Sequence, residues 1–232
     1  MYQPECLGTL FGSNIVASSN EQSSGSTVAV ASGPTRAANT PEEALALLRE
    51  GNARYVAGTS GGHDYTKARM ERARAQKPFA AVLSCADSRV APELIFDAQP
   101  GQLFVSRDAG NFISPTSTAS FEYAVAELGV PLLLVLGHSS CGAVDATIKV
   151  LESGTALPGH LPVLTDAITP AVERVRGDAG ALLANSIVSN VKLNVEQMTA
   201  IEPILEPAVA RGDVAVAGGV YDIATGQVSF IC

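Results

Sequence analysis

Metal-binding types of side chain directly follow two short apolar runs of the sequence, residues 79–84 and 132–137. Cys85 follows the first run, and His138 and Cys141 follow the second. Runs of this length and composition predict buried strands. Parallel strands bring their carboxyl ends to the same edge of a sheet, where ligands collect. We therefore expect the three side chains to converge, which requires a fold that holds both runs side by side in one sheet.

The rest of the chain alternates predicted strands with predicted helices. A third apolar run, residues 102–106, predicts another buried strand, and helical periodicity over residues 117–128 stops at Gly129. Further helices are expected over residues 142–151, 161–175 and 179–200, and late strands over 213–217 and 227–231. This alternation predicts an α/β fold with a central, mainly parallel β-sheet flanked by helices.

The composition changes near residue 40. Residues 1–39 are rich in Ser, Ala, Gly and Thr and carry almost no charge, which predicts a poorly ordered N-terminal arm. Thr40-Pro41-Glu42-Glu43 has the pattern of a helix start, with a capping threonine, proline in the first turn and glutamate three residues after the cap. We expect one enzyme domain over residues 40–232.

Charge and cysteine content exclude several classes of protein. The formal net charge of -8 gives no basic surface for nucleic acid or anionic membranes. No run approaches the roughly 20 apolar residues of a membrane span, and the N-terminus lacks the pattern of a signal peptide. The 4 cysteines are too sparse for a disulfide scaffold. We expect a cytoplasmic protein with reduced thiols that binds neither nucleic acid nor membrane.

Cys85, His138 and Cys141 form a donor set that is typical of zinc. Thiolates and an imidazole select zinc or a similar metal over magnesium or calcium. Three protein ligands leave a fourth position for water, as catalytic zinc sites do. Asp87 lies two residues after Cys85, so its carboxylate can point to the same side and serve either the metal or Arg89.

Each residue also has a structural explanation when it is taken alone. A cysteine after a buried strand is usually a core side chain, and a buried histidine can be satisfied by a main-chain carbonyl. Asp87 and Arg89 could form a surface ion pair of little consequence. Their occurrence together favours a metal site. Two other classes of protein are alternatives. One is a structural zinc module, in which Asp87 is a permanent fourth ligand. The other is a redox thiol protein, which would favour a Cys-x-x-Cys pair that the sequence lacks.

The pair Cys85-Ala86-Asp87-Ser88-Arg89 and His138-Ser139-Ser140-Cys141-Gly142 resembles the signature of the β-class carbonic anhydrases. Arg107-Asp108-Ala109-Gly110-Asn111 resembles that family's loop after the second strand, and Phe121-Glu122-Tyr123-Ala124-Val125 its following helix. The resemblance covers most of residues 41–232. It implies a zinc enzyme that reversibly hydrates carbon dioxide to bicarbonate and a proton, by zinc-bound hydroxide that an Asp87-Arg89 dyad orients.

The same resemblance implies the ligands, the substrate contacts and the assembly. Zn²⁺ would be held by Cys85, His138 and Cys141, with Asp87 as an alternative ligand. Substrate contacts would come from Gln76, Tyr123 and Gly142. The family implies a homodimer or a homotetramer.

Other features of the sequence bear on regulation and specificity. Some bacterial relatives build a regulatory bicarbonate pocket from a tryptophan, an arginine and a tyrosine. Arg107 and Tyr221 match two of these, but Val82 occupies the tryptophan position, so we expect an incomplete pocket. The ligand set does not separate carbon dioxide from carbon disulfide or carbonyl sulfide as substrate. His63 and His160 follow glycine and are expected in solvated loops.

Overall fold

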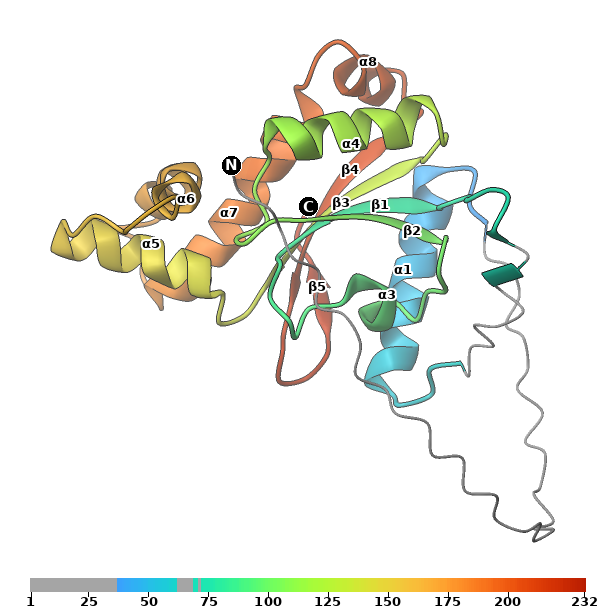
Figure 1. Ribbon diagram of the computed structural model, residues 1–232. Helices are drawn as coiled ribbons and strands as arrows, with labels where there is room; N and C mark the ends of the chain where they lie inside the picture. The colour runs from blue at the N-terminus through green and yellow to red at the C-terminus, as the bar shows by residue number, and fades with distance from the viewer. Residues whose placement is uncertain (1–36, 62–68, 71) are drawn as a thin grey trace, which may run out of the picture.

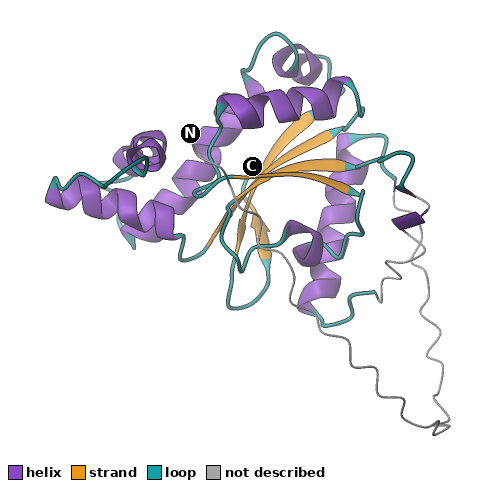
Figure 2. Ribbon diagram, viewed as in Figure 1, coloured by secondary structure: helices purple, strands orange, loops and turns teal. Residues whose placement is uncertain are grey.

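A five-stranded sheet forms the centre of the protein, and helices cover both of its faces (Figures 1 and 2). The computed structural model describes residues 37–61, 69–70 and 72–232. Most of the predicted arm and His63 lie outside the described residues. Within the described part of the chain, no helix is both long and apolar enough to cross a membrane.

The sheet has the order β2-β1-β3-β4-β5, and its first four strands are parallel. The strands are β1 (Ala80–Ser84), β2 (Leu103–Arg107), β3 (Leu132–His138), β4 (Ala215–Tyr221) and β5 (Val228–Phe230). Strand β5 pairs antiparallel with β4 at one edge. Every residue of β1 and β3 is buried, as expected of central strands that are covered on both faces. The predicted mainly parallel sheet is confirmed.

Two apolar layers hold the helices against the sheet. Helices α1 (Pro41–Val56) and α3 (Pro92–Ile95) pack on one face through residues such as Leu48 and Phe96. Helices α4 (Pro115–Ala126), α7 (Leu182–Thr199) and α8 (Leu205–Ala210) cover the other. Helices α5 (Gly142–Ser153) and α6 (Pro162–Arg174) form a hairpin that packs against α7 and extends away from the sheet (Figure 1).

Local signals set the helix starts. Thr40 accepts a hydrogen bond from the Glu43 amide, and the Glu43 carboxylate accepts one from the Asn39 amide. Helix α1 therefore begins at Pro41, as the sequence predicts. Helix α4 begins at Pro115, two residues before the predicted start, because Ser114 forms a reciprocal capping box with Ser117.

Glycines let helix α7 approach the sheet closely. A Cβ atom at Gly137 of β3 would lie 2.6 Å from the Val191 side chain of α7, and one at Gly218 of β4 would lie 2.8 Å from the same residue. Glycine usually weakens a strand, so the sequence predicts that this strand ends at residue 217. Strand β4 in fact continues to Tyr221, because its glycines leave the space that α7 fills.

We expect Gly137→Ala to lower the free energy of unfolding by about 1–3 kcal/mol, because the added methyl group overpacks the contact with Val191. Urea denaturation would measure the change. Gly177→Ala is the matched control, since a Cβ there would meet no atom within 4 Å. Equal stabilities of the two variants would show that β3 and α7 can separate without cost.

Candidate metal centre

Three ligand side chains meet at the carboxyl edge of the sheet. Cys85 follows the last residue of β1, His138 is the last residue of β3, and Cys141 precedes the first residue of α5. One potential ligand atom from each lies within 4.8 Å of the other two, and all three residues are buried. The structure thus brings together the three residues that the sequence selects as ligands.

The histidine is prepared to give a lone pair to a metal. Its Nδ1 atom lies 2.9 Å from the main-chain oxygen of Ser139, an acceptor, so Nδ1 carries the proton. Its Nε2 atom is buried and makes no hydrogen bond with any described residue. A buried, unpaired nitrogen beside two sulfur atoms is costly in a site without an ion and fits a zinc ligand.

A hydrogen bond between the two thiols moves their pKa values in opposite directions. The hydrogen bond from Cys141, helped by contacts with His138 and the Gly110 amide and opposed by burial, lowers the pKa of Cys85 to about 4. The same hydrogen bond, together with burial, raises the pKa of Cys141. The hydrogen bond therefore favours the charged form at Cys85 over Cys141, and a bound dication would favour deprotonation of both sulfur atoms.

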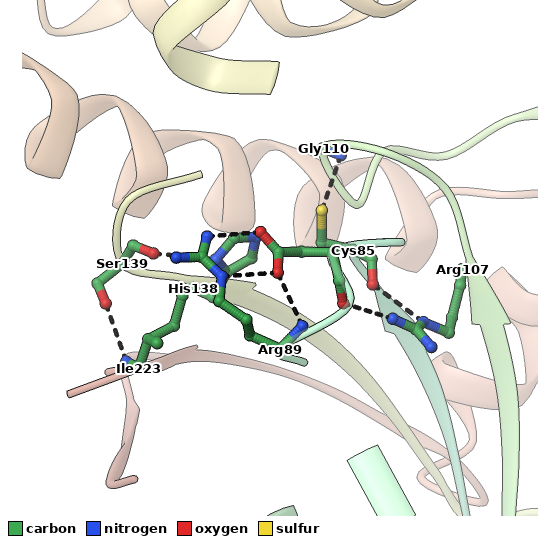
Figure 3. A network of polar contacts seen from close by, with 8 residues as sticks. Cys85, Arg89, Arg107, Gly110, His138, Ser139 and Ile223 are labelled. Carbon is green, nitrogen blue, oxygen red and sulfur yellow. Dashed lines mark hydrogen bonds and ion pairs between the residues drawn. The ribbon is translucent and has the colours of Figure 1, made fainter. Parts of the chain in front are cut away.

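Ser139 fastens the histidine to the end of the sheet. Its amide donates to the Tyr221 carbonyl over 2.8 Å. Its hydroxyl accepts from the Ile223 amide over 3.0 Å, as Figure 3 shows. The carbonyl of the same residue accepts the His138 proton. The sequence analysis gives Ser139 no role, because these bonds go to main-chain atoms of Tyr221 and Ile223, more than 80 residues away.

Asp87 is held by Arg89 rather than by the metal group. The Nε and Nη2 atoms of Arg89 lie 2.9 and 2.7 Å from the two carboxylate oxygens, and its amide also donates to Asp87 over 2.9 Å (Figure 3). These bonds hold the pKa of Asp87 well below its usual range. Asp87 is not among the residues grouped within 4.8 Å of one another.

Arg107, at the end of β2, holds the main chain that carries Cys85 and Asp87. Its Nε atom donates to the Cys85 carbonyl over 3.0 Å, and its Nη2 atom donates to the Asp87 carbonyl over 2.7 Å (Figure 3). The sequence analysis relates Arg107 to an anion pocket and misses this contact. Nothing in the sequence could have indicated it, because the acceptors are main-chain oxygens.

The remaining predicted site residues lie in different places. Gly142 is exposed beside Cys141, and a Cβ on it would meet no atom within 4 Å. Gln76 is exposed before the start of β1, at the opposite end of that strand from Cys85. Tyr123 is 48% exposed on α4, and its ring centroid lies 6.1 Å from that of Phe104. Gly142 therefore lies next to a ligand of the centre, whereas Gln76 lies at the other end of β1 and Tyr123 lies beside Phe104.

Tyr221 and Val82 lie on strands that flank the centre. The Tyr221 hydroxyl lies 3.3 Å from the Tyr55 hydroxyl, and burial together with this contact raises the pKa of Tyr221 to about 12. Val82 is fully buried in the layer beneath α1. His160 is exposed in the turn before α6, as the sequence predicts.

Comparisons with known proteins agree in one family. The family model described as Carbonic anhydrase matches residues 80–228. A carbonic anhydrase of Mycolicibacterium smegmatis is 37% identical over 192 residues, which are 81% of this chain and 92% of the relative. Carbonic anhydrase 2 of Mycobacterium tuberculosis is 37% identical over 191 residues, 81% of this chain and 91% of that protein.

Solved structures give the same answer for the fold. The β-carbonic anhydrase of Coccomyxa in complex with acetazolamide has a TM-score of 0.63 at 28% identity, over 81% of this chain and 86% of that one. A tetrameric β-carbonic anhydrase of Sordaria macrospora has a TM-score of 0.63 at 25% identity, over 72% of this chain and 90% of that one.

Proposed function

We propose roles for the residues of the metal centre in the reaction of this chain. The chain belongs to the β-class carbonic anhydrase family. It catalyses the zinc-dependent, reversible hydration of carbon dioxide to bicarbonate and a proton. One observation carries the proposal. Ligand atoms of Cys85, His138 and Cys141 lie within reach of one metal ion, and the Nε2 atom of His138 has no hydrogen-bond partner among the described residues. Arg89 meanwhile binds the carboxylate of Asp87.

Cys85, His138 and Cys141 would hold the zinc ion. When bound, zinc supplies a nucleophile near neutral pH by acidifying a coordinated water molecule, a property long associated with carbonic anhydrases. The protein keeps the ligands in place through the Ser139 bond to His138 and through the Arg107 bond to the carbonyl of Cys85. Such contacts fix ligand orientation without touching the metal.

Asp87 would orient the attacking oxygen. Its carboxylate stands two residues after a metal ligand and is fixed by three hydrogen bonds from Arg89. A fixed acceptor can take a hydrogen bond from that oxygen and aim a lone pair at the carbon of the substrate. Arg89 would position Asp87 and keep it from competing for the fourth ligand position.

Carbon dioxide would enter beside Gly142. This glycine is exposed at the start of α5 and has open space where a side chain would be. Buried apolar side chains pack around the two cysteines, including Val144 and Ile168. A small, uncharged and linear substrate suits a site with open space on one side and apolar walls on the other.

A substrate contact by Gln76 would need a second copy of the chain. Gln76 lies beyond the amino end of β1, whereas the metal group lies beyond its carboxyl end, so the two do not meet within one chain. A homodimer or homotetramer could bring one copy's Gln76 or Tyr123 to the other copy's site. The tetrameric relative from Sordaria macrospora supports such an assembly.

A cytoplasmic location is also proposed, because both cysteine ligands must stay reduced to bind zinc.

Two alternatives differ from this function in testable ways. Carbon disulfide and carbonyl sulfide are also linear molecules open to the same attack, so turnover of the three gases by one purified sample separates the substrates. A structural zinc module would need a fourth protein ligand. The hold of Arg89 on Asp87, through both carboxylate oxygens, favours the catalytic function.

We expect Cys141→Ala to lose zinc and carbon dioxide hydration together, because two protein ligands hold zinc far less tightly than three. Elemental analysis and a hydration assay on the folded protein measure both. Cys232→Ala is the matched control, since Cys232 is a free, exposed cysteine. Full zinc content in folded Cys141→Ala protein would remove Cys141 from the ligand set.

We expect Arg89→Ala to keep its zinc but to lose about tenfold or more in turnover, as loss of a positioning partner usually does. Without Arg89, Asp87 is free to bind the metal, and X-ray absorption at the zinc edge should then detect a carboxylate ligand. Arg174→Ala, which breaks an exposed ion pair with Glu196, controls for loss of a surface charge. Near-normal turnover with an unchanged zinc spectrum would reduce the dyad to an ordinary ion pair.

We expect inhibition by bicarbonate at fixed pH to be non-cooperative. Arg107 donates to two main-chain carbonyls, the Tyr221 hydroxyl is paired with Tyr55, and Val82 leaves no indole beside them. An anion pocket built from these residues would therefore lack the indole, and its arginine and tyrosine already have partners within the chain. Initial rates over a bicarbonate series, at constant ionic strength, test this. A steep sigmoidal loss of rate would contradict it.

A further inference from the structure

We propose that Asn190 and Asn194 of helix α7 are positioning residues for the metal centre: they fix the main chain of the loop at Gly110, so that the Gly110 N–H donates to the Cys85 sulfur. The inference rests on the proposed ligand role of Cys85. It assigns a function to two residues of α7 that the sequence analysis leaves without one.

The Gly110 amide lies 3.3 Å from the Cys85 sulfur, and Figure 3 shows it pointing at that atom. The carbonyl of the same glycine accepts a hydrogen bond of 2.8 Å from Asn190 Nδ2. Three residues further along the loop, the Ile113 amide donates to Asn194 Oδ1 over 2.7 Å. Helix α7 thus holds the loop at two points, one within its turn and one after it.

The two asparagines also hold each other. Asn194 Nδ2 lies 2.8 Å from the Asn190 carbonyl and 3.2 Å from Asn190 Oδ1. Each residue is 1% exposed. Their amide orientations follow from their partners, because the Gly110 carbonyl can only accept and the Ile113 amide can only donate. A spacing of four residues places both side chains on one face of the helix, toward the loop.

The packing around Gly110 makes this hold rigid. Gly110 has φ +92°, a conformation that favours glycine, and a Cβ there would lie 2.6 Å from Ile168 of α6. On the other side, Gly137 lets α7 come close enough to the sheet for its asparagines to reach the loop. Gly110 therefore packs against Ile168 of α6 while Asn190 of α7 holds its carbonyl.

An N–H bond to the sulfur has a chemical consequence for a bound metal. Two thiolates give a metal more electron density than imidazoles would, which opposes acidification of a coordinated water. A hydrogen bond to a thiolate withdraws part of that density and stabilises the charged form of the sulfur. By holding Gly110 in place, Asn190 and Asn194 adjust how strongly Cys85 donates to the metal.

Cobalt substitution makes this adjustment visible. In cobalt-loaded protein, absorption from sulfur-to-cobalt charge transfer reports the energy of the sulfur electrons. We expect Asn190→Ala to shift this band to lower energy, because the sulfur loses a well-placed hydrogen bond. We also expect its affinity for zinc, measured by competition with a chelator, to fall by about tenfold or more.

Asn52→Ala is the matched control. Asn52 is also a buried asparagine, 5% exposed, that donates to loop carbonyls, those of Ile95 and Gly226, and accepts from the Val228 amide. It lies on α1, on the opposite face of the sheet from α7. Its removal should lower stability while leaving the cobalt band and the zinc affinity unchanged.

The outcomes separate this inference from the proposed function. A wild-type cobalt band with wild-type zinc affinity in Asn190→Ala overturns the inference, and so does an equal change in Asn52→Ala. Failure of the wild-type protein to bind zinc overturns the ligand assignment itself. If Asn190→Ala does not fold, Asn190→Ser, whose hydroxyl is about one bond too short for the Gly110 carbonyl, takes its place with the same expected shift.

Discussion

The parallel pairing of β1 with β3 is the constraint on which the metal centre depends. Ser84 pairs with Leu136, so Cys85 lies one residue beyond the pair on one strand and His138 two residues beyond it on the other. A slip of one residue in this register would turn one ligand toward the opposite face of the sheet. Complete burial of both strands opposes such a slip, because the apolar side chains pack against helices on both faces.

The edge of the sheet brings the ligands together, but they lie on the loops that follow the strands. Hydrogen bonds to the main chain of these loops hold the ligands in place. Arg107 binds the carbonyls after β1, and Ser139 ties the chain after β3 to β4. Asn190 fixes the loop after β2. Each bond joins segments that are far apart in sequence, so the geometry of the centre depends on the whole sheet and on α7.

The sequence predicts much of this structure because the informative patterns are local. The central strands, the start of α1 and the converging ligands follow from apolar runs, a capping motif and the positions of Cys85 and His138. The extension of β4 through Gly218 could not be predicted, because it depends on the space that α7 fills. The sequence analysis gives no bounds for the short helices α3 and α8.

The supporting residues of the site are harder to predict than its ligands, for a related reason. A ligand must be a particular chemical group, so Cys85 is conspicuous in a sequence. A positioning residue needs only a donor or an acceptor at the right place, and its partner is often a carbonyl that every residue has. Asn190 therefore looks like any polar residue of a helix until the fold places Gly110 beside it.

The charges at the centre explain why a pair such as Asp87 and Arg89 suits this reaction. Two thiolates balance a bound dication, so the metal group is neutral as a whole. Without Arg89, the negative charge of Asp87 would be attracted to the metal, and Asp87 would tend to bind it as a fourth ligand. Arg89 cancels that charge and holds both carboxylate oxygens, which lets Asp87 accept a hydrogen bond without becoming a ligand. The protein groups and a bound dication then sum to no net charge, so the centre has no excess positive charge to retain bicarbonate once it forms.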